Sequence, residues 1–130
     1  MTLDSKIQAA VDLIATELKG EFATFVKSYN PEGRPLRVVR KTWQVQKGGF
    51  IEARGKVEAS FQDPSWGGLA RLQANLWLDE QDLINLEIWF NGCGLMEAAP
   101  VNGRHLELDE LPDLLTKGFA KLTKWLEEAL

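Results

Sequence analysis

A strict alternation of apolar and polar residues over residues 51–61 constrains this chain more than any other feature. Every second position from Ile51 to Phe61 is apolar or glycine, which is the period of a β-strand with one buried face. The opposite face carries four charged side chains: Glu52, Arg54, Lys56 and Glu58. A helix packed over that face would bury these ions, at several kcal/mol for each one left unpaired. We therefore expect any helices to cover the other face.

Three further segments have the composition of strands. Residues 36–46 are rich in β-branched and aromatic side chains, and residues 69–78 and 83–90 alternate in the same way as 51–61. Turn residues between the segments predict an antiparallel meander with one buried face. A register that pairs Leu76 with Leu86 keeps the apolar sets of the last two strands together. It also sets Gln73 beside Trp89 and Trp77 beside Asn85.

Helical periodicity flanks the four strands on both sides. Apolar residues recur every three or four positions over 3–29 and again over 109–130. We expect Thr2 or Asp4 to cap the first helix, Gly20 to kink it, and Asp109 to cap the last helix. Residues 91–108 form a long connection in which Leu95–Ala99 or Arg104–Leu108 is a candidate short fifth strand. The prediction is a single two-layer α+β domain, residues 1–130, of order α-β-β-β-β-α, with both helices on one face.

Composition narrows the chemistry available to this domain. One Cys and one His exclude an internal disulfide and leave almost no zinc ligands, and we find no GxGxxG, GxxxxGK[ST] or HExxH motif. Charged residues interrupt the apolar runs near the N-terminus, which disfavours a signal peptide or a membrane span. We therefore expect a cytoplasmic protein with no metal, no cofactor and no membrane contact.

The face opposite the predicted core, which we call the outer face, carries exposed tryptophans. Trp77 and Trp89 fall on it, and Trp43 joins them if the first hairpin places it opposite Arg54 rather than opposite Ala53 inside. Tryptophan is enriched at the buried centres of protein interfaces, although long neighbours or the 91–108 connection can also cover such rings. The favoured interpretation is a non-enzymatic protein-interaction module, a homodimer or adaptor. Its predicted contact residues are Trp77, Trp89, Trp43, Gln73, Asn75 and Asn85.

Two other surfaces supply alternative hypotheses. The 91–108 connection holds Cys93, His105 and Glu97, the residue types of thiol catalysis, but no known motif surrounds them. The segment 33–50 is basic and contains no acid; its cations are Arg34, Arg37, Arg40, Lys41 and Lys47. This strip is typical either of a polyanion site or of a strand edge protected against aggregation. The net charge of −4 disfavours a nucleic-acid partner.

A further alternative is an apolar small-molecule pocket between the sheet and the helices. The predicted inner face has small residues that leave room for a ligand or let a helix approach closely: Gly55, Ala59, Ala70 and Ala74.

Overall fold

The fold is described by a computed structural model, which covers residues 2–29, 35–47, 51–62, 69–81, 83–92, 95–98 and 104–129. The helices are α1 (Leu3–Glu17), α2 (Glu21–Tyr29) and α3 (Leu111–Ala129), with a 3₁₀ turn η1 (Leu108–Glu110) before α3. The strands are β1 (Arg37–Lys47), β2 (Ile51–Gln62), β3 (Leu69–Leu78), β4 (Ile84–Gly92), β5 (Leu95–Ala98) and β6 (Arg104–Leu106).

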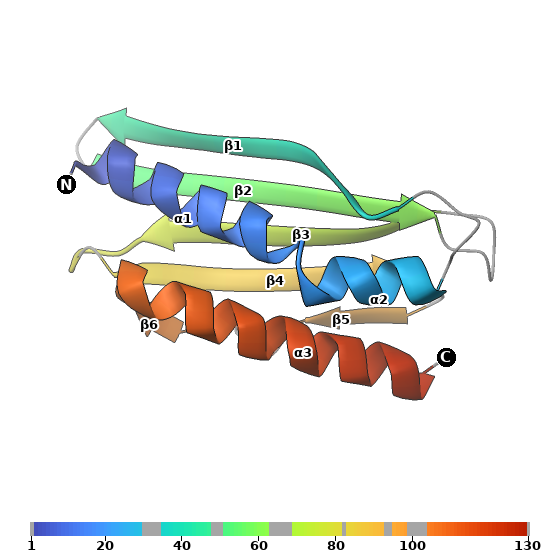
Figure 1. Cartoon of the computed structure of the whole chain (residues 1–130). Coiled ribbons are helices and arrows are strands. Elements are labelled where there is room, and N and C mark those ends of the chain that lie inside the picture. Colours follow the sequence, from blue (N-terminus) through green and yellow to red (C-terminus); the bar gives the residue numbers. More distant parts are fainter. Residues whose placement is uncertain are drawn as a thin grey trace.

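All three helices lie on one face of a twisted antiparallel sheet (Figure 1). The strand order is β1-β2-β3-β4-β5, and β6 also pairs with β4. This arrangement confirms the two-layer α+β prediction. Both candidate segments of the 91–108 connection form short strands: β5 pairs with one end of β4 and β6 with the other.

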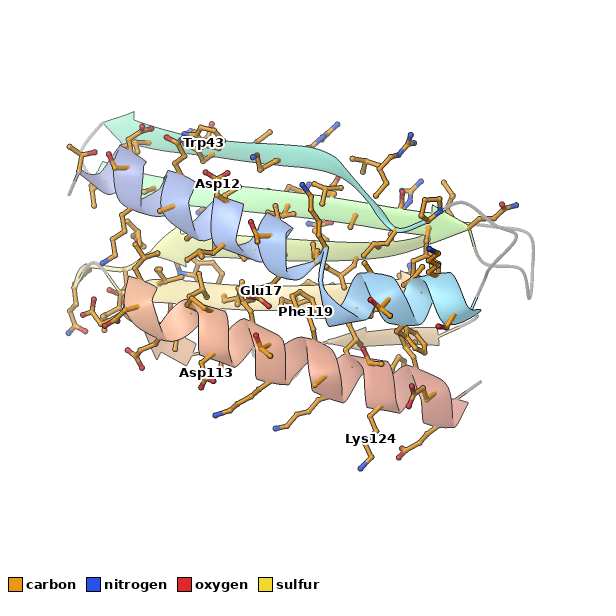
Figure 2. All side chains as sticks on the ribbon, viewed as in Figure 1. Asp12, Glu17, Trp43, Asp113, Phe119 and Lys124 are labelled. Atoms are coloured by element: carbon orange, nitrogen blue, oxygen red, sulfur yellow. The ribbon has the colours of Figure 1, made fainter. Side chains whose placement is uncertain are left out.

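The alternation of each long strand divides its side chains between two environments. Along β3, every second residue from Ala70 to Leu78 is buried, and the residues between them are exposed or half-buried. The predicted pairing of Leu76 with Leu86 is confirmed, and it sets Trp77 beside Asn85. The core lies between this sheet face and the helices, and its largest members include Ile7, Ile14, Phe22, Leu72, Phe90 and Leu115. Figure 2 shows Phe119 directed toward the sheet, whereas the exposed side chain of Lys124 points away from it.

Helix α1 packs closely over β2 because Gly55 has no side chain. A Cβ atom built at Gly55 would lie 2.6 Å from Val11 Cγ2 and 3.2 Å from Leu76 Cγ. The space above Gly55 is therefore filled by α1. Close packing, rather than a ligand pocket, explains this small residue on the inner face.

The N-terminal helical segment is interrupted more completely than the predicted kink. At residues 18–20 the hydrogen bonds shorten to 3₁₀ type, from Lys19 N to Thr16 O and from Gly20 N to Glu17 O, both 3.0 Å. The segment then resumes as α2 in a new direction (Figure 1). This places the ring of Phe22 5.7 Å from that of Phe119, at the contact between α2 and α3.

The helix caps agree with expectation at one end of the chain and differ at the other. Thr2 Oγ1 accepts a hydrogen bond from Ser5 N at 3.1 Å, as expected for the cap of α1. The prediction that Asp109 caps the last helix is wrong. Asp109 lies inside η1, whose N-cap is Glu107, and Glu107 N donates to Glu110 Oε1 at 3.0 Å.

Candidate interaction face

The outer face, the sheet surface opposite the helices, gathers the exposed apolar side chains of the structure. Within the described residues, the large hydrophobic side chains that are exposed are Val39 (50%), Leu69 (48%), Trp77 (37%) and Trp89 (42%). Trp77, Trp89 and Leu69 occupy outward positions of β3 and β4. Val39 is the extra residue of a β-bulge in β1 between Val38 and Arg40, and it borders the same surface. These four residues share one sheet face, along which Trp89 (opposite Gln73) and Trp77 stand four and eight residues of β3 from Leu69.

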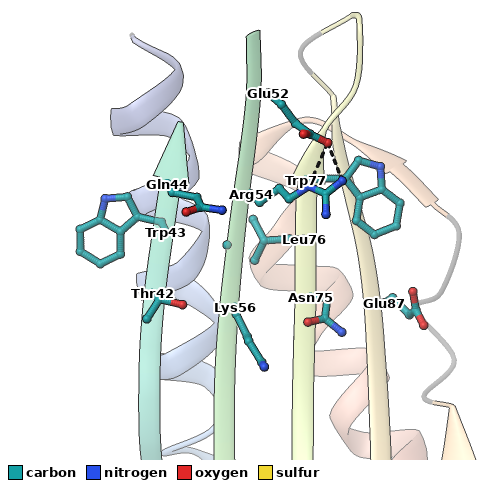
Figure 3. A pocket seen from close by; sticks show the side chains of 11 residues that line it. Thr42, Trp43, Gln44, Glu52, Arg54, Lys56, Asn75, Leu76, Trp77 and Glu87 are labelled. Carbon is teal, nitrogen blue, oxygen red and sulfur yellow. Dashed lines mark hydrogen bonds and ion pairs between the residues drawn. The ribbon is translucent and has the colours of Figure 1, made fainter. Parts of the chain in front are cut away.

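The surface is hollowed at both ends of the long strands. One groove of about 760 Å³ runs across β1 to β4 beside Trp77 (Figure 3); its lining includes Thr42, Gln44, Arg54, Lys56, Asn75 and Glu87. A second hollow of about 350 Å³ contains Val39, Leu69, Arg71 and Gln73. Trp77, Val39 and Leu69 therefore lie beside concave surfaces into which the side chains of a partner can fit.

The ions of the outer face are largely paired within the chain. Arg54 Nη2 contacts Glu52 Oε1 at 2.6 Å, and Lys56 Nζ contacts Glu58 Oε1 at 2.8 Å. Arg40 lies 3.8 Å from the other oxygen of Glu58. The hydrogen bond from Lys56 holds the pKa of Glu58 below its usual value; desolvation opposes this shift, and the charges of Lys56, Arg40 and Arg71 support it. The Glu58 carboxylate is thus stabilised as an anion by three cations, Lys56, Arg40 and Arg71.

The predicted contact residues Gln73 and Asn75 lie on this surface and are half-buried, joined by a hydrogen bond of 3.0 Å. Asn85 is on the same face in register but is only 5% exposed. Its Nδ2 donates to Asp79 Oδ2 and to Leu83 O, both at 3.3 Å, and Asp79 Oδ1 accepts from Leu83 N at 3.0 Å. The prediction of Asn85 as a contact residue is therefore corrected, because its amide secures the turn between β3 and β4.

Trp43 belongs to the helix side of the sheet. Lys47 pairs with Ile51, so the hairpin connection has three residues rather than two, and Trp43 stands opposite Gly55. Its half-buried ring packs against the core. In Figure 3 its indole is directed away from Arg54 and Trp77. The register that would place Trp43 with the outer tryptophans is therefore wrong.

The basic strip of residues 33–50 is divided between the two faces. Lys41 Nζ reaches across to Asp12 Oδ1 of α1 at 2.8 Å, on the helix side. Arg37 and Arg40 hold outward positions, and Arg40 is engaged by Glu58. Arg34 and the side chain of Lys47 lie outside the described residues. The described cations of the strip therefore do not form one polyanion surface.

The residues of the thiol hypothesis are only partly described. Cys93 lies outside the described residues. Glu97 pairs with Phe90 and His105 with Asn85, at positions five residues apart on β4, which is roughly 17 Å along a strand. The backbone register therefore does not place Glu97 beside His105.

Sequence reasoning missed Val39, because its outward position depends on the bulge in β1. The alternation of β3 places Leu69 on the outer face, but Leu69 is not among the predicted contact residues.

Within the described residues, no group of three His, Cys, Asp or Glu side chains is placed to hold a metal ion. None of the helices in this part of the chain is long and apolar enough to cross a membrane. Comparisons with protein-family models, curated proteins and solved structures found no match to this chain.

Proposed function

We propose that this chain is a non-enzymatic interaction module that binds a protein partner through its outer face. The observation that carries this proposal is the placement of Val39, Leu69, Trp77 and Trp89, all exposed and all on the sheet surface opposite the three described helices. We place the module in the cytoplasm, where a single cysteine stays reduced.

The chemistry of the face favours a protein over other partners. Protein interfaces combine a few aromatic anchors with a surrounding set of polar groups that already satisfy one another. Trp77 and Trp89 supply the anchors, and the Arg54–Glu52 and Lys56–Glu58 pairs supply satisfied ions. A polyanion site would instead leave its cations free for phosphates.

A site-specific photo-crosslinker tests this proposal. Gln44 is exposed and lines the groove, so a benzophenone side chain at position 44 should form adducts with protein in cells that express the chain. The same probe at Lys121, exposed on α3, is the matched control. We expect adducts from position 44 only, and their loss in a Trp77→Ala/Trp89→Ala variant. Equal labelling from both positions, or none from position 44, would contradict the proposal.

A further inference from the structure

We infer that the protein partner is a second copy of this chain, packed outer face against outer face about a two-fold axis parallel to the strands and between β2 and β3. This inference rests on the proposed function and names its partner. It follows from how the cations and the aromatic rings are distributed over the sheet.

The cations and the tryptophans occupy different halves of the outer face. Arg40 lies on β1 and Arg54 on β2, whereas Trp77 lies on β3 and Trp89 on β4. The register shows that they fall in two cross-strand rows. Arg54 pairs directly with Trp77 in one row. The other row crosses all four strands in the order Arg40, Glu58, Gln73 and Trp89.

A two-fold axis parallel to the strands exchanges these halves without moving the rows. It sets β2 of one copy over β3 of the other, and β1 over β4. Arg54 then faces Trp77 of the second copy, and Arg40 faces Trp89. A guanidinium over an indole ring is a favourable contact, and the symmetry makes each contact twice.

The remaining rows are also compatible with this pairing. Between the two tryptophan rows, Thr42 faces Glu87 and Lys56 faces Asn75; at the end of the strands, Ser60 faces Arg71 and Gln62 faces Leu69. No pair of like charges is opposed in these rows. Self-complementarity of this kind is what an isologous interface requires.

The other aligned arrangement, with the axis perpendicular to the strands, fits less well. An axis through the row of Lys56 or of Glu58 places that ion over its own copy. An axis midway between those rows avoids this and sets Trp77 over Arg71, and Lys56 over Glu58, two ions that are already paired within the chain. It also sets Glu87 over the ring of Trp89, where the negative π-face repels a carboxylate, so only one of the two tryptophans gains a cation. The parallel axis is free of both conflicts.

The size of the face suits a dimer of this kind. Four strands at about 4.8 Å spacing and about ten residues in length give a footprint of roughly 600 Å² per copy, so two copies together exceed the roughly 1,000 Å² expected of a specific interface. Burial of the centre of the face would leave Arg54 and Lys56 paired, because each forms an ion pair with a carboxylate of the same chain.

Analytical ultracentrifugation of the full chain tests this inference. We expect a species of twice the monomer mass of 14.6 kDa, with a dissociation constant in the micromolar range. Trp77→Ala and Trp89→Ala should each weaken the dimer by about tenfold or more, because each ring enters the interface twice. Lys121→Ala, on α3, should leave it unchanged. A dimer unaffected by both tryptophan substitutions would overturn the inference.

Crosslinking with a short bis-maleimide in a Cys93→Ala background tests the axis, because facing sheets pack about 10 Å apart, beyond the reach of a direct disulfide. Thr42→Cys mixed with Glu87→Cys should crosslink, and neither variant should do so alone; crosslinking absent from the mixture would refute this geometry. A chain that stays monomeric but forms adducts with another protein from position 44 defeats the self-partner inference and leaves the proposed function standing. A monomer that forms no adducts, or that binds only RNA, defeats both.

Discussion

Replacement of Gly55 by alanine tests how closely α1 packs on the sheet. The added Cβ would lie 2.6 Å from Val11 Cγ2, whereas unstrained carbon contacts are about 3.5–4.0 Å, so α1 or Val11 must move by roughly 1 Å. The backbone of Gly55 is in a conformation that alanine adopts readily, so the effect comes from this contact and not from backbone strain.

Two opposing contributions set the magnitude. Overpacking a core site lowers the free energy of unfolding by about 1–3 kcal/mol. Replacing glycine raises it by about 0.4–1 kcal/mol, because alanine restricts the unfolded chain. We therefore expect Gly55→Ala to lower the free energy of unfolding by about 1–2 kcal/mol. Val11→Ala should cost about 1.5–3 kcal/mol through lost burial of a side chain that is fully inaccessible.

A double-mutant cycle separates this contact from general damage. In the Val11→Ala background the methyl of alanine at position 55 occupies vacated space, so the double variant should be at least about 1 kcal/mol more stable than additivity predicts. Urea unfolding followed by tryptophan fluorescence measures all four proteins, and Ser60→Ala, on the outward side of the same strand, serves as the control. The reasoning is refuted if Gly55→Ala stabilises the protein, or if the two changes add to within about 0.5 kcal/mol.

Substitutions at two further positions, Glu58 and Asn85, probe polar groups of the outer face. Because the pKa of Glu58 is lowered in the folded state, its contribution is present above the unfolded carboxyl value of about 4.3 and is lost as pH falls through the folded pKa. Glu58→Gln should therefore be less stable than the wild type at neutral pH and converge with it in acid, and parallel urea midpoints across pH would contradict the role of Lys56. Asn85→Ala should cost about 1–2 kcal/mol, and Asn85→Asp more at neutral pH because it faces Asp79, with the excess disappearing in acid. Equal loss for the two variants at every pH would show that charge at this turn is unimportant.

The register of the sheet was predictable because burial specifies it. A slip of one residue between β3 and β4 would turn the whole apolar set of each strand outward, so pairing Leu76 with Leu86 is strongly determined. The charges of β2 likewise excluded a helix from the outer face, and the helices accordingly share the opposite side.

The first hairpin was harder to predict because β1 is an edge strand with mixed polarity. Its register depends on whether the connection after Lys47 has two or three residues, and the alternation of β1 alone satisfies either. Trp43 changes face with that choice. The bulge at Val39 has no signature in local composition, so neither that exposed side chain nor the second hollow could be predicted.

Asn85 shows a different limit of the sequence pattern. Alternation gives the face of the sheet to which a residue belongs, but not whether a neighbouring turn folds over it. Asp79 sits at the start of the turn and accepts the amide of Asn85, which leaves that side chain 5% exposed beside the exposed Trp77. Face and accessibility are separate properties, and only the first follows from a period of two.

The two faces of β2 and β3 have different roles, stability on the inward side and the proposed association on the outward side. On the inward side, Gly55 and Leu76 hold α1 at close distance, and stability depends on that contact. On the outward side, the Arg54 side chain is 63% exposed, so its truncation should change stability by less than about 0.5 kcal/mol, whereas Trp77 is 37% exposed and its truncation also removes packing within the sheet. If the outer face serves association, variants of Arg54 should alter binding without altering unfolding of the monomer, measured at protein concentrations too low for association, and variants of Gly55 should do the reverse. An Arg54→Ala chain that lost stability as severely as Gly55→Ala would place that guanidinium in the fold rather than in an interface.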